Sequence, residues 1–229
     1  MHALRQTPNR ALLQAQRERA GMNSRRALAM LLIGTGACAV AVSDPAAAEP
    51  GSPEAGRAVF VEKQCVRCHL PRSERGPGPA LEVIRRPQGE MELTGRLWNH
   101  LPAMFASVTG RGAAWPEISV AEMGDLMAYL QADARRDAEP DLAKGRMTLL
   151  RKGCLKCHSL RREGGPVKPD LAERRSDYAS AAAWATTMWA HTPRMAAMAS
   201  RQGVPYPRFT GDEMANLVGL LRRTASENP

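Results

Sequence analysis

The sequence predicts an all-α protein made of two tandem copies of one small helical unit. A five-residue pattern with two cysteines and a histidine occurs at Cys65–His69 and again at Cys154–His158, 89 positions later. The flanking residues repeat at nearly the same spacing, which indicates a tandem duplication. No stretch alternates polar and apolar residues for long enough to predict a strand. We expect one copy over residues 51–133 and the other over 142–225, joined by a polar linker around 132–140.

Residues 1–48 have the composition of a secretory signal peptide. Arg25 and Arg26 precede an apolar run over 27–42, and three small residues follow at 46–48. We therefore expect cleavage after Ala48 and export to the periplasm. The apolar run is shorter than the roughly 20 residues of a membrane-spanning helix.

Two features of this leader leave alternatives open. Translation begins at Met1 or at Met22, because the residues ahead of Met22 add nothing that a signal peptide needs. Cys38 is a candidate lipidation site, which would give membrane-surface association, but Thr35 stands where a lipobox has a large aliphatic residue. The pair at Arg25 and Arg26 also resembles a twin-arginine signal, although general secretion is favoured.

The charge of the chain argues weakly against nucleic-acid binding. The formal net charge is +9, of which about half lies in the leader. The remaining arginines are scattered along the sequence instead of forming a basic stripe. We expect no nucleic-acid partner, whereas docking on an acidic protein stays open.

Each copy contains three helical segments that can be placed from the sequence. We expect first helices over Gly56–Val66 and Lys144–Leu155, and third helical segments over Glu92–His100 and Ala181–His191 that end ahead of Pro102 and Pro193. The last helices begin at the capping boxes Ser119–Glu122 and Thr210–Glu213. The segments Pro71–Pro87 and Arg161–Ala172 are rich in Gly, Pro and charge, and we expect them to be loops.

The repeated five-residue pattern carries the chemistry. Cys-x-x-Cys-His is the attachment signal for c-type haem, because two thiols can each add to a vinyl group while the adjacent imidazole reaches the iron. We therefore expect two covalent haem c groups, attached through Cys65, Cys68, Cys154 and Cys157, with His69 and His158 as proximal ligands. A zinc ribbon would place its cysteine pairs roughly 15 to 20 residues apart. A redox dithiol would need a βαβ unit, and two disulfides would not explain the histidines.

On these motifs the chain resembles the class I cytochrome c family in its dihaem, two-domain form. The resemblance extends from Gly56 to Leu221 and includes the segments Pro79–Leu81 and Pro169–Leu171. It implies two tandem small cytochrome c domains, each wrapped around one covalently attached haem. It also implies that the proline carbonyl of each segment accepts a hydrogen bond from the proximal imidazole. The second copy departs from the family by having Leu149 and Leu220 where the first has Phe60 and Tyr129, which suggests looser packing.

The distal ligand has three interpretations. Met104 and Met195 follow the prolines that we expect to end the third helix, in a manner that resembles the class I distal loop, and we favour them. His100 and His191, four positions earlier, are the alternative ligands, or else they cap a helix C-terminus, where imidazole is favoured. An open iron site is the third interpretation. Met123 and Met214 also repeat, but they lie at core spacing in the last helix, where a packing role is expected.

Two six-coordinate haems leave one-electron transfer as the available chemistry. We expect a non-enzymatic periplasmic electron carrier, whose partners are other redox proteins or a membrane respiratory complex. The alternatives are a dihaem peroxidase and a cytochrome subunit of a membrane-bound dehydrogenase or oxidase. A peroxidase is less favoured because the two copies match almost loop for loop. A sensor module is less favoured because too few residues follow Leu221 for a signalling domain.

Overall fold

The computed structural model describes residues 51–167 and 169–228. The leader, with Cys38 and the expected cleavage site at Ala48, lies outside the described residues. The described part is mostly helical, with seven α-helices, short 3₁₀ turns and one two-stranded hairpin. The predicted all-α class is thus confirmed. No helix among the described residues is both long and apolar enough to cross a membrane.

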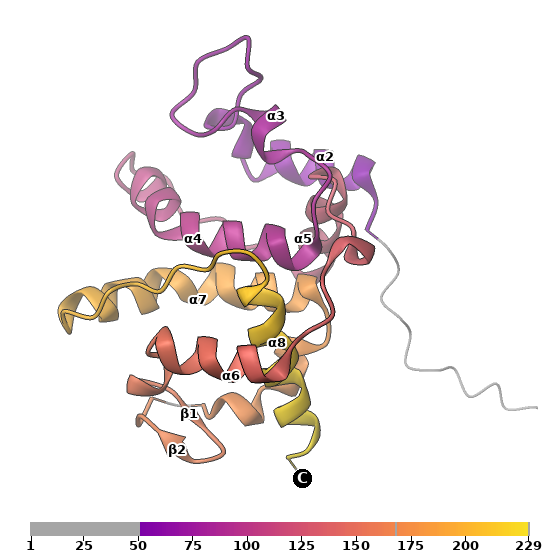
Figure 1. The fold of residues 1–229 in the computed structure, drawn as a ribbon. Coiled ribbons are helices and arrows are strands. Elements are labelled where there is room, and N and C mark those ends of the chain that lie inside the picture. The colour runs from indigo at the N-terminus through magenta and orange to yellow at the C-terminus, as the bar shows by residue number, and fades with distance from the viewer. Residues whose placement is uncertain (1–50, 168, 229) are drawn as a thin grey trace, which may run out of the picture. The chain divides into compact units, whose positions relative to one another are not determined.

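The first repeat contains helices α2 to α5 (Figure 1). Their bounds are α2 Pro53–Glu62, α3 Leu81–Ile84, α4 Glu90–Thr109 and α5 Val120–Tyr129. A 3₁₀ turn, Cys65–Arg67, follows α2.

The second repeat contains α6 Leu142–Arg151, α7 Ala181–Arg201 and α8 Glu213–Ser226. Three 3₁₀ turns lie between α6 and α7, at Cys154–Lys156, Leu171–Glu173 and Arg175–Tyr178. The expected loop after the second motif contains a hairpin of β1 Ser159–Leu160 and β2 Glu163–Gly164. Its turn residues, Arg161 and Arg162, have φ values of 53° and 68°. Positive φ at both central residues is what a type I′ hairpin turn requires, and strands of two residues leave no alternation to detect.

The first and last helices of each repeat cross at a glycine. Helix α2 packs on α5 and α6 packs on α8. A Cβ at Gly56 would collide with the backbone carbonyl of Asp125, and one at Gly145 with that of Asn216. Only glycine permits this close approach of two helix backbones.

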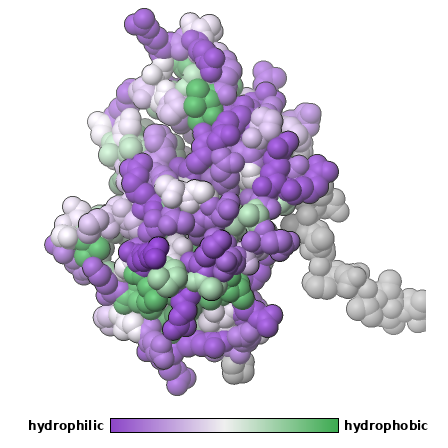
Figure 2. Space-filling model, viewed as in Figure 1, coloured by the Kyte–Doolittle hydropathy of each residue, from purple (hydrophilic) through white to green (hydrophobic). Residues whose placement is uncertain are grey.

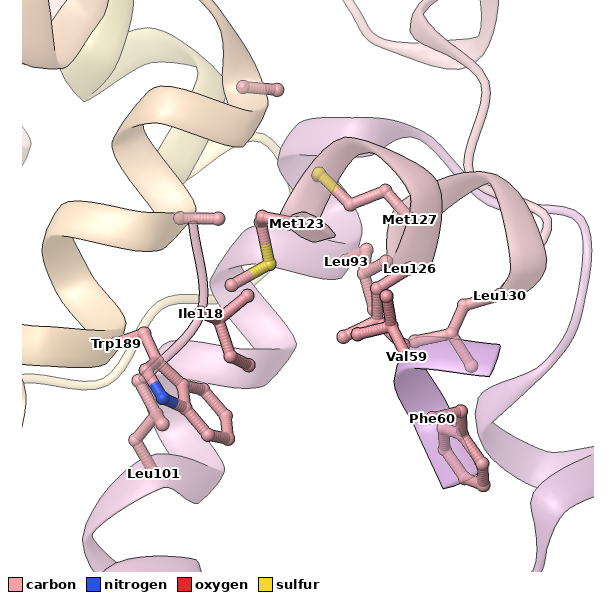
Figure 3. Packing of buried hydrophobic residues seen from close by; sticks show 12 residues of the cluster. Val59, Phe60, Leu93, Leu101, Ile118, Met123, Leu126, Met127, Leu130 and Trp189 are labelled. Atoms are coloured by element: carbon pink, nitrogen blue, oxygen red, sulfur yellow. The ribbon is translucent and has the colours of Figure 1, made fainter. Parts of the chain in front are cut away.

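The third helices, α4 and α7, pack against each other across the interface between the repeats (Figure 1). Each contributes a tryptophan to the hydrophobic core of the other repeat. Trp189 of α7 lies with Leu101 and Ile118 in the first core (Figure 3), and Trp98 of α4 lies in the second. The two cores are therefore interlocked.

The expectation that these helices end before Pro102 and Pro193 is wrong, because both helices continue to Thr109 and Arg201. A proline inside a helix removes one N–H and leaves the carbonyl four residues earlier without its donor. Those carbonyls belong to Trp98 and Trp189, and the other repeat supplies the missing donors. The hydroxyl of Tyr206 donates to the Trp98 carbonyl at 3.1 Å, and Trp115 Nε1 donates to the Trp189 carbonyl at 3.2 Å.

The same tryptophans make a second pair of reciprocal contacts. Trp98 Nε1 donates to the carbonyl of Pro207 and Trp189 Nε1 to that of Pro116, both at 2.7 Å. Their rings also stack, Trp98 on Tyr206 and Trp189 on Trp115, with centroids 5.4 Å and 4.2 Å apart. We call these four aromatic residues the aromatic clasp. It relates the repeats by an approximate two-fold symmetry and joins them more closely than the linker alone would.

The two predicted capping boxes have different outcomes. Ser119 and Glu122 form the complete box at the start of α5, as predicted. Only half of the box at Thr210 forms, because α8 begins at Glu213 with Asp212 as its N-cap. The Thr210 N–H donates to the Glu213 carboxylate at 2.9 Å, as in a capping box, but the Thr210 hydroxyl donates to the same carboxylate at 3.2 Å instead of accepting from the Glu213 N–H. The Glu213 carboxylate, by accepting two hydrogen bonds from Thr210, stabilises the turn ahead of α8, but it does not extend α8 back to Thr210.

The linker is docked on the first repeat. A 3₁₀ turn covers Ala134–Arg136, and the Asp133 N–H donates to the Gln88 carbonyl at 2.9 Å. The Asp137 carboxylate accepts from the Met91 N–H at 2.9 Å, in the first turn of α4. Negative charge is favourable at a helix N-terminus. The polar residues that marked the linker in the sequence therefore attach it to α4.

One face of the molecule combines a hydrophilic surface with a local apolar area (Figure 2). The apolar area lies over α6, where Leu142, Met147 and Leu150 are exposed. Helix α6 leads directly to the second cysteine motif.

Candidate functional site

Both cysteine motifs lie in tight turns and not on the first helices as expected. Helices α2 and α6 end at Glu62 and Arg151, and the residue before each first cysteine has positive φ. These residues are Gln64, at 62°, and Gly153, at 72°. Left-handed backbone ends a helix, and a 3₁₀ turn follows. Because a 3₁₀ helix has about three residues per turn, cysteines three apart lie on one side of it.

The four thiols of the motifs form no disulfide. Burial raises the pKa of Cys65 and of Cys154 to about 11. A reactive dithiol has the opposite property, a lowered pKa in an electropositive setting. These two thiols are therefore suited to lie against an apolar group and are poorly suited to disulfide exchange.

The proximal imidazole of the first repeat is oriented as the family resemblance implies. His69 Nδ1 lies 2.9 Å from the Pro79 carbonyl oxygen. A carbonyl can only accept, so Nδ1 carries the proton and Nε2 keeps its lone pair for a metal. Gly78 lies so close that a Cβ there would be 2.9 Å from the His69 ring. The loop is thus fitted to the imidazole.

The second repeat does not make the equivalent contact. His158 Nδ1 is buried and has no hydrogen-bond partner among the described residues. The loop from His158 to Pro169 is one residue longer than that from His69 to Pro79. Both loops bond to the second cysteine of their motif, but the donor is Gly78, one residue before Pro79, in the first loop at 3.1 Å and Val167, two residues before Pro169, in the second at 2.8 Å. The proline carbonyl that the resemblance assigns to His158 is therefore not used.

A cavity of about 610 Å³ lies beside the first motif. Ligand pockets usually have volumes of about 300 to 1,000 Å³. Its lining is mainly apolar and includes Cys65, Cys68, His69, His100, Met104 and Trp189. Attachment thiols, a proximal imidazole and an apolar wall are the groups that a covalent haem needs, and the residues present fit that cofactor.

The candidate distal residues lie on helices and not in a loop. His100 and Met104 are one turn apart on α4, and His191 and Met195 hold the same places on α7. The helix-capping interpretation of the histidines is wrong, because α4 extends nine residues past His100 and α7 ten past His191. All four side chains are partly buried.

Each of the two histidines on α4 and α7 faces the histidine of a cysteine motif. The ring centroids of His69 and His100 are 6.2 Å apart, and those of His158 and His191 are 6.0 Å apart. Burial, and then the facing imidazole, lower the pKa of His100 and of His191. Neutral imidazoles present a lone pair.

The packing role of the other repeated methionines is confirmed. Met123 is 0% exposed and Met214 is 1% exposed. Met123 lies within the first core (Figure 3), and Met214 Sδ accepts from Trp184 Nε1 at 3.2 Å. Neither belongs to a distal site.

Sequence reasoning missed that the second repeat contributes to the first site. Trp189 belongs to the second repeat, yet it lines the cavity beside the first motif. The repeated tryptophans at 98 and 189 were a visible signal, but spacing within one copy cannot indicate a contact with the other copy.

No family model matches this chain, and no curated protein or solved structure is significantly similar to it.

Proposed function

We propose that this protein is a dihaem c-type cytochrome that carries single electrons, with one covalently attached haem in each of two tandem cytochrome c domains. The observation that carries the proposal is the first motif, whose thiols and imidazole line an apolar cavity of about 610 Å³. The second motif has the same turn, and its histidine also faces a second imidazole.

The protein residues have distinct tasks in this proposal. Bound haem supplies reversible one-electron exchange at its iron. Cys65, Cys68, Cys154 and Cys157 attach the cofactor, and His69 and His158 hold the proximal side. The apolar wall excludes water, and the aromatic clasp fixes α4 and α7, which carry the distal candidates.

An electron carrier is favoured over a dihaem peroxidase. Peroxide chemistry needs one iron with an open position and therefore two unlike sites. Here the two repeats present equivalent distal residues at nearly equal ring separations, 6.2 Å and 6.0 Å. The similarity of the sites favours two closed irons.

The surface supports a protein partner. Excess positive charge outside the leader favours encounter with an acidic redox protein or a membrane respiratory complex. The apolar side chains of Leu142, Met147 and Leu150 on α6 would be the centre of a small, transient contact next to the second motif. A cytochrome subunit of a membrane-bound dehydrogenase or oxidase would use the same contact.

The export signal predicted from the sequence favours the periplasm as the location of this activity. Haem attachment to these thiols requires the compartment in which c-type cytochromes mature. Intact-mass measurement of the purified protein should give a chain that begins at Glu49 and carries two haems. A chain that begins at a lipidated Cys38 would place the protein on a membrane surface instead.

A haem count tests the proposal directly. Acid denaturation should leave the haem attached, and the pyridine haemochrome should give about two haems per chain. Replacing Cys65 and Cys68 by alanine should lower the ratio to about one, and the matched pair Cys154→Ala and Cys157→Ala should do the same. Bound zinc, or no covalent haem, would contradict the proposal.

A second experiment separates carrier from enzyme. The fully reduced protein is mixed with peroxide or with an oxidised carrier protein at two salt concentrations. A carrier should show salt-sensitive oxidation by its partner and only slow, non-catalytic oxidation by peroxide. Rapid catalytic turnover of peroxide would identify a peroxidase.

A further inference from the structure

We propose that His100 and His191, and not Met104 and Met195, bind the iron opposite His69 and His158, so that both haems have two imidazole ligands. This inference rests on the proposed dihaem function. It reverses the preference that the sequence supported, and the reasons lie in the geometry of α4 and α7.

The first reason is the separation of the facing rings. Two imidazoles that bind one metal from opposite sides at about 2.0 Å place their centroids about 6.3 Å apart, since the binding nitrogen lies about 1.1 Å from the centroid. The observed separations are 6.2 Å for His69 and His100 and 6.0 Å for His158 and His191. The interplanar angles are also alike, 60° and 57°. Two sites with different loops reach the same arrangement.

The second reason is that one helix carries both candidates. An α-helix rises about 1.5 Å per residue, so Met104 lies about 6 Å farther along α4 than His100. A straight helical turn cannot place both side chains at the same point opposite His69. Because the His100 ring already lies at the ligand distance, the methionine is displaced toward the end of the helix. The same relation holds for His191 and Met195 on α7.

The third reason is that the methionines have another role. Met104 packs against the first hydrophobic core and Met195 against the second. Methionine is an adaptable filler of such cores. By contrast, no hydrogen bond from the His100 or His191 ring is found within residues 51–167 and 169–228. A half-buried imidazole that has no hydrogen-bond partner in either repeat among the described residues is explained by a role as a metal ligand.

The fourth reason is that the histidine-bearing turns are held rigidly. Trp98 lies two residues before His100 and is fixed at both its indole N–H and its carbonyl, by Pro207 and Tyr206. Trp189 is held in the same way by Pro116 and Trp115. Ligands supported by such contacts keep their position when the metal is bound.

The inference has a spectroscopic consequence. Thioether ligation raises the reduction potential of a haem, so two imidazoles should give lower potentials than a histidine and methionine pair. The ferric protein should be low-spin, and it should lack the weak near-infrared band that arises from sulfur-to-iron charge transfer.

The experiment uses the purified holoprotein, with the haem ratio measured first. About two haems per chain, together with a low-spin ferric spectrum that lacks the sulfur-to-iron band, supports the inference. A ratio near two with the band present overturns it while leaving the dihaem function intact. A ratio of zero contradicts the proposed function itself, so the two failures are distinguishable.

Variants then assign the ligands. His100→Gly should convert one of the two haems to a high-spin form that binds carbon monoxide when reduced, and added imidazole should restore the low-spin spectrum. Met104→Leu, which keeps the volume, is the matched control and should leave the spectrum unchanged. His191→Gly and Met195→Leu form the same pair in the second repeat. Loss of the low-spin form in either methionine variant, with retention in the histidine variant, would overturn the inference.

Discussion

The hydroxyl of Tyr206 donates to the carbonyl of Trp98, 3.1 Å away, which Pro102 leaves without a helical donor. Trp115 does the same for the Trp189 carbonyl, which Pro193 leaves without a donor. Each proline therefore produces an acceptor on one repeat that only the other repeat satisfies. The prolines, which in isolation would end the helices, have become part of the interface between the repeats.

We expect Tyr206→Phe to destabilise the holoprotein by about 1 to 3 kcal/mol, because a partly buried carbonyl loses its donor while the stacked ring remains. Denaturant unfolding of the wild type and the variant measures this. Tyr129→Phe is the matched control, because the Tyr129 hydroxyl makes no hydrogen bond among the described residues, and it should change stability by no more than about 0.5 kcal/mol. Equal losses in both variants would contradict the role given to Tyr206.

Restoring the helical donor should remove the need for Tyr206. In a Pro102→Ala background the alanine N–H can donate to the Trp98 carbonyl, so Tyr206→Phe should cost at least about 1 kcal/mol less than in the wild type. A double-mutant cycle of unfolding free energies measures this coupling. Additive effects would show that Pro102 and Tyr206 do not share the Trp98 carbonyl.

Asp170 should make the second repeat sensitive to acid. Its carboxylate is 2% exposed and accepts from the N–H groups of Arg162, Ala172 and Arg161 at 2.6 to 2.9 Å. Burial alone would raise the pKa of Asp170, but these backbone hydrogen bonds and one from Ser159 outweigh it and lower the pKa. A lowered folded-state pKa gives stability that is complete above the unfolded value, about 3.9, and is lost as the pH falls through the folded value.

We therefore expect Asp170→Asn to cost about 1.5 to 3 kcal/mol at neutral pH, with the difference from wild type shrinking below about pH 4. Unfolding free energies measured from pH 7 to pH 3 check this. Glu163→Gln is the control on the hairpin that Asp170 contacts, since Glu163 is exposed and has no side-chain partner among the described residues. A difference that stays constant with pH would show that the Asp170 charge is not involved.

The two haems should differ in reduction potential. A hydrogen bond at Nδ1 makes an imidazole a more basic ligand and stabilises ferric iron. His69 has this bond to the Pro79 carbonyl, whereas His158 Nδ1 has no partner among the described residues. A redox titration should resolve two transitions, and the lower one should disappear when Cys65 and Cys68 are replaced. Loss of the higher transition instead would show that the Pro79 hydrogen bond does not set the order.

The sequence by itself showed the duplication, determined the helical class and predicted the attachment chemistry. Five contiguous residues suffice for the motif, because the relation of Cys65, Cys68 and His69 depends only on the local turn. Core periodicity identified Met123 and Met214 correctly, and the capping box at Ser119 was visible because all of its bonds lie within one turn. Thr210 shows the limit of this reasoning, since the same spacing produced only one of the two capping-box hydrogen bonds.

Only the tertiary structure decided how far α4 and α7 extend, where Trp189 lies and which residues face the proximal histidines. Pro102 and Pro193 predict helix ends in any single repeat, and the donors that rescue their carbonyls lie more than 70 positions away in the sequence. Because α4 continues through Pro102, His100 and Met104 lie one turn apart on the same helix. Their side chains therefore occupy different positions along the helix axis. The loop that the resemblance placed after Pro102 is absent for this physical reason: a long-range hydrogen bond replaces the one that proline removes.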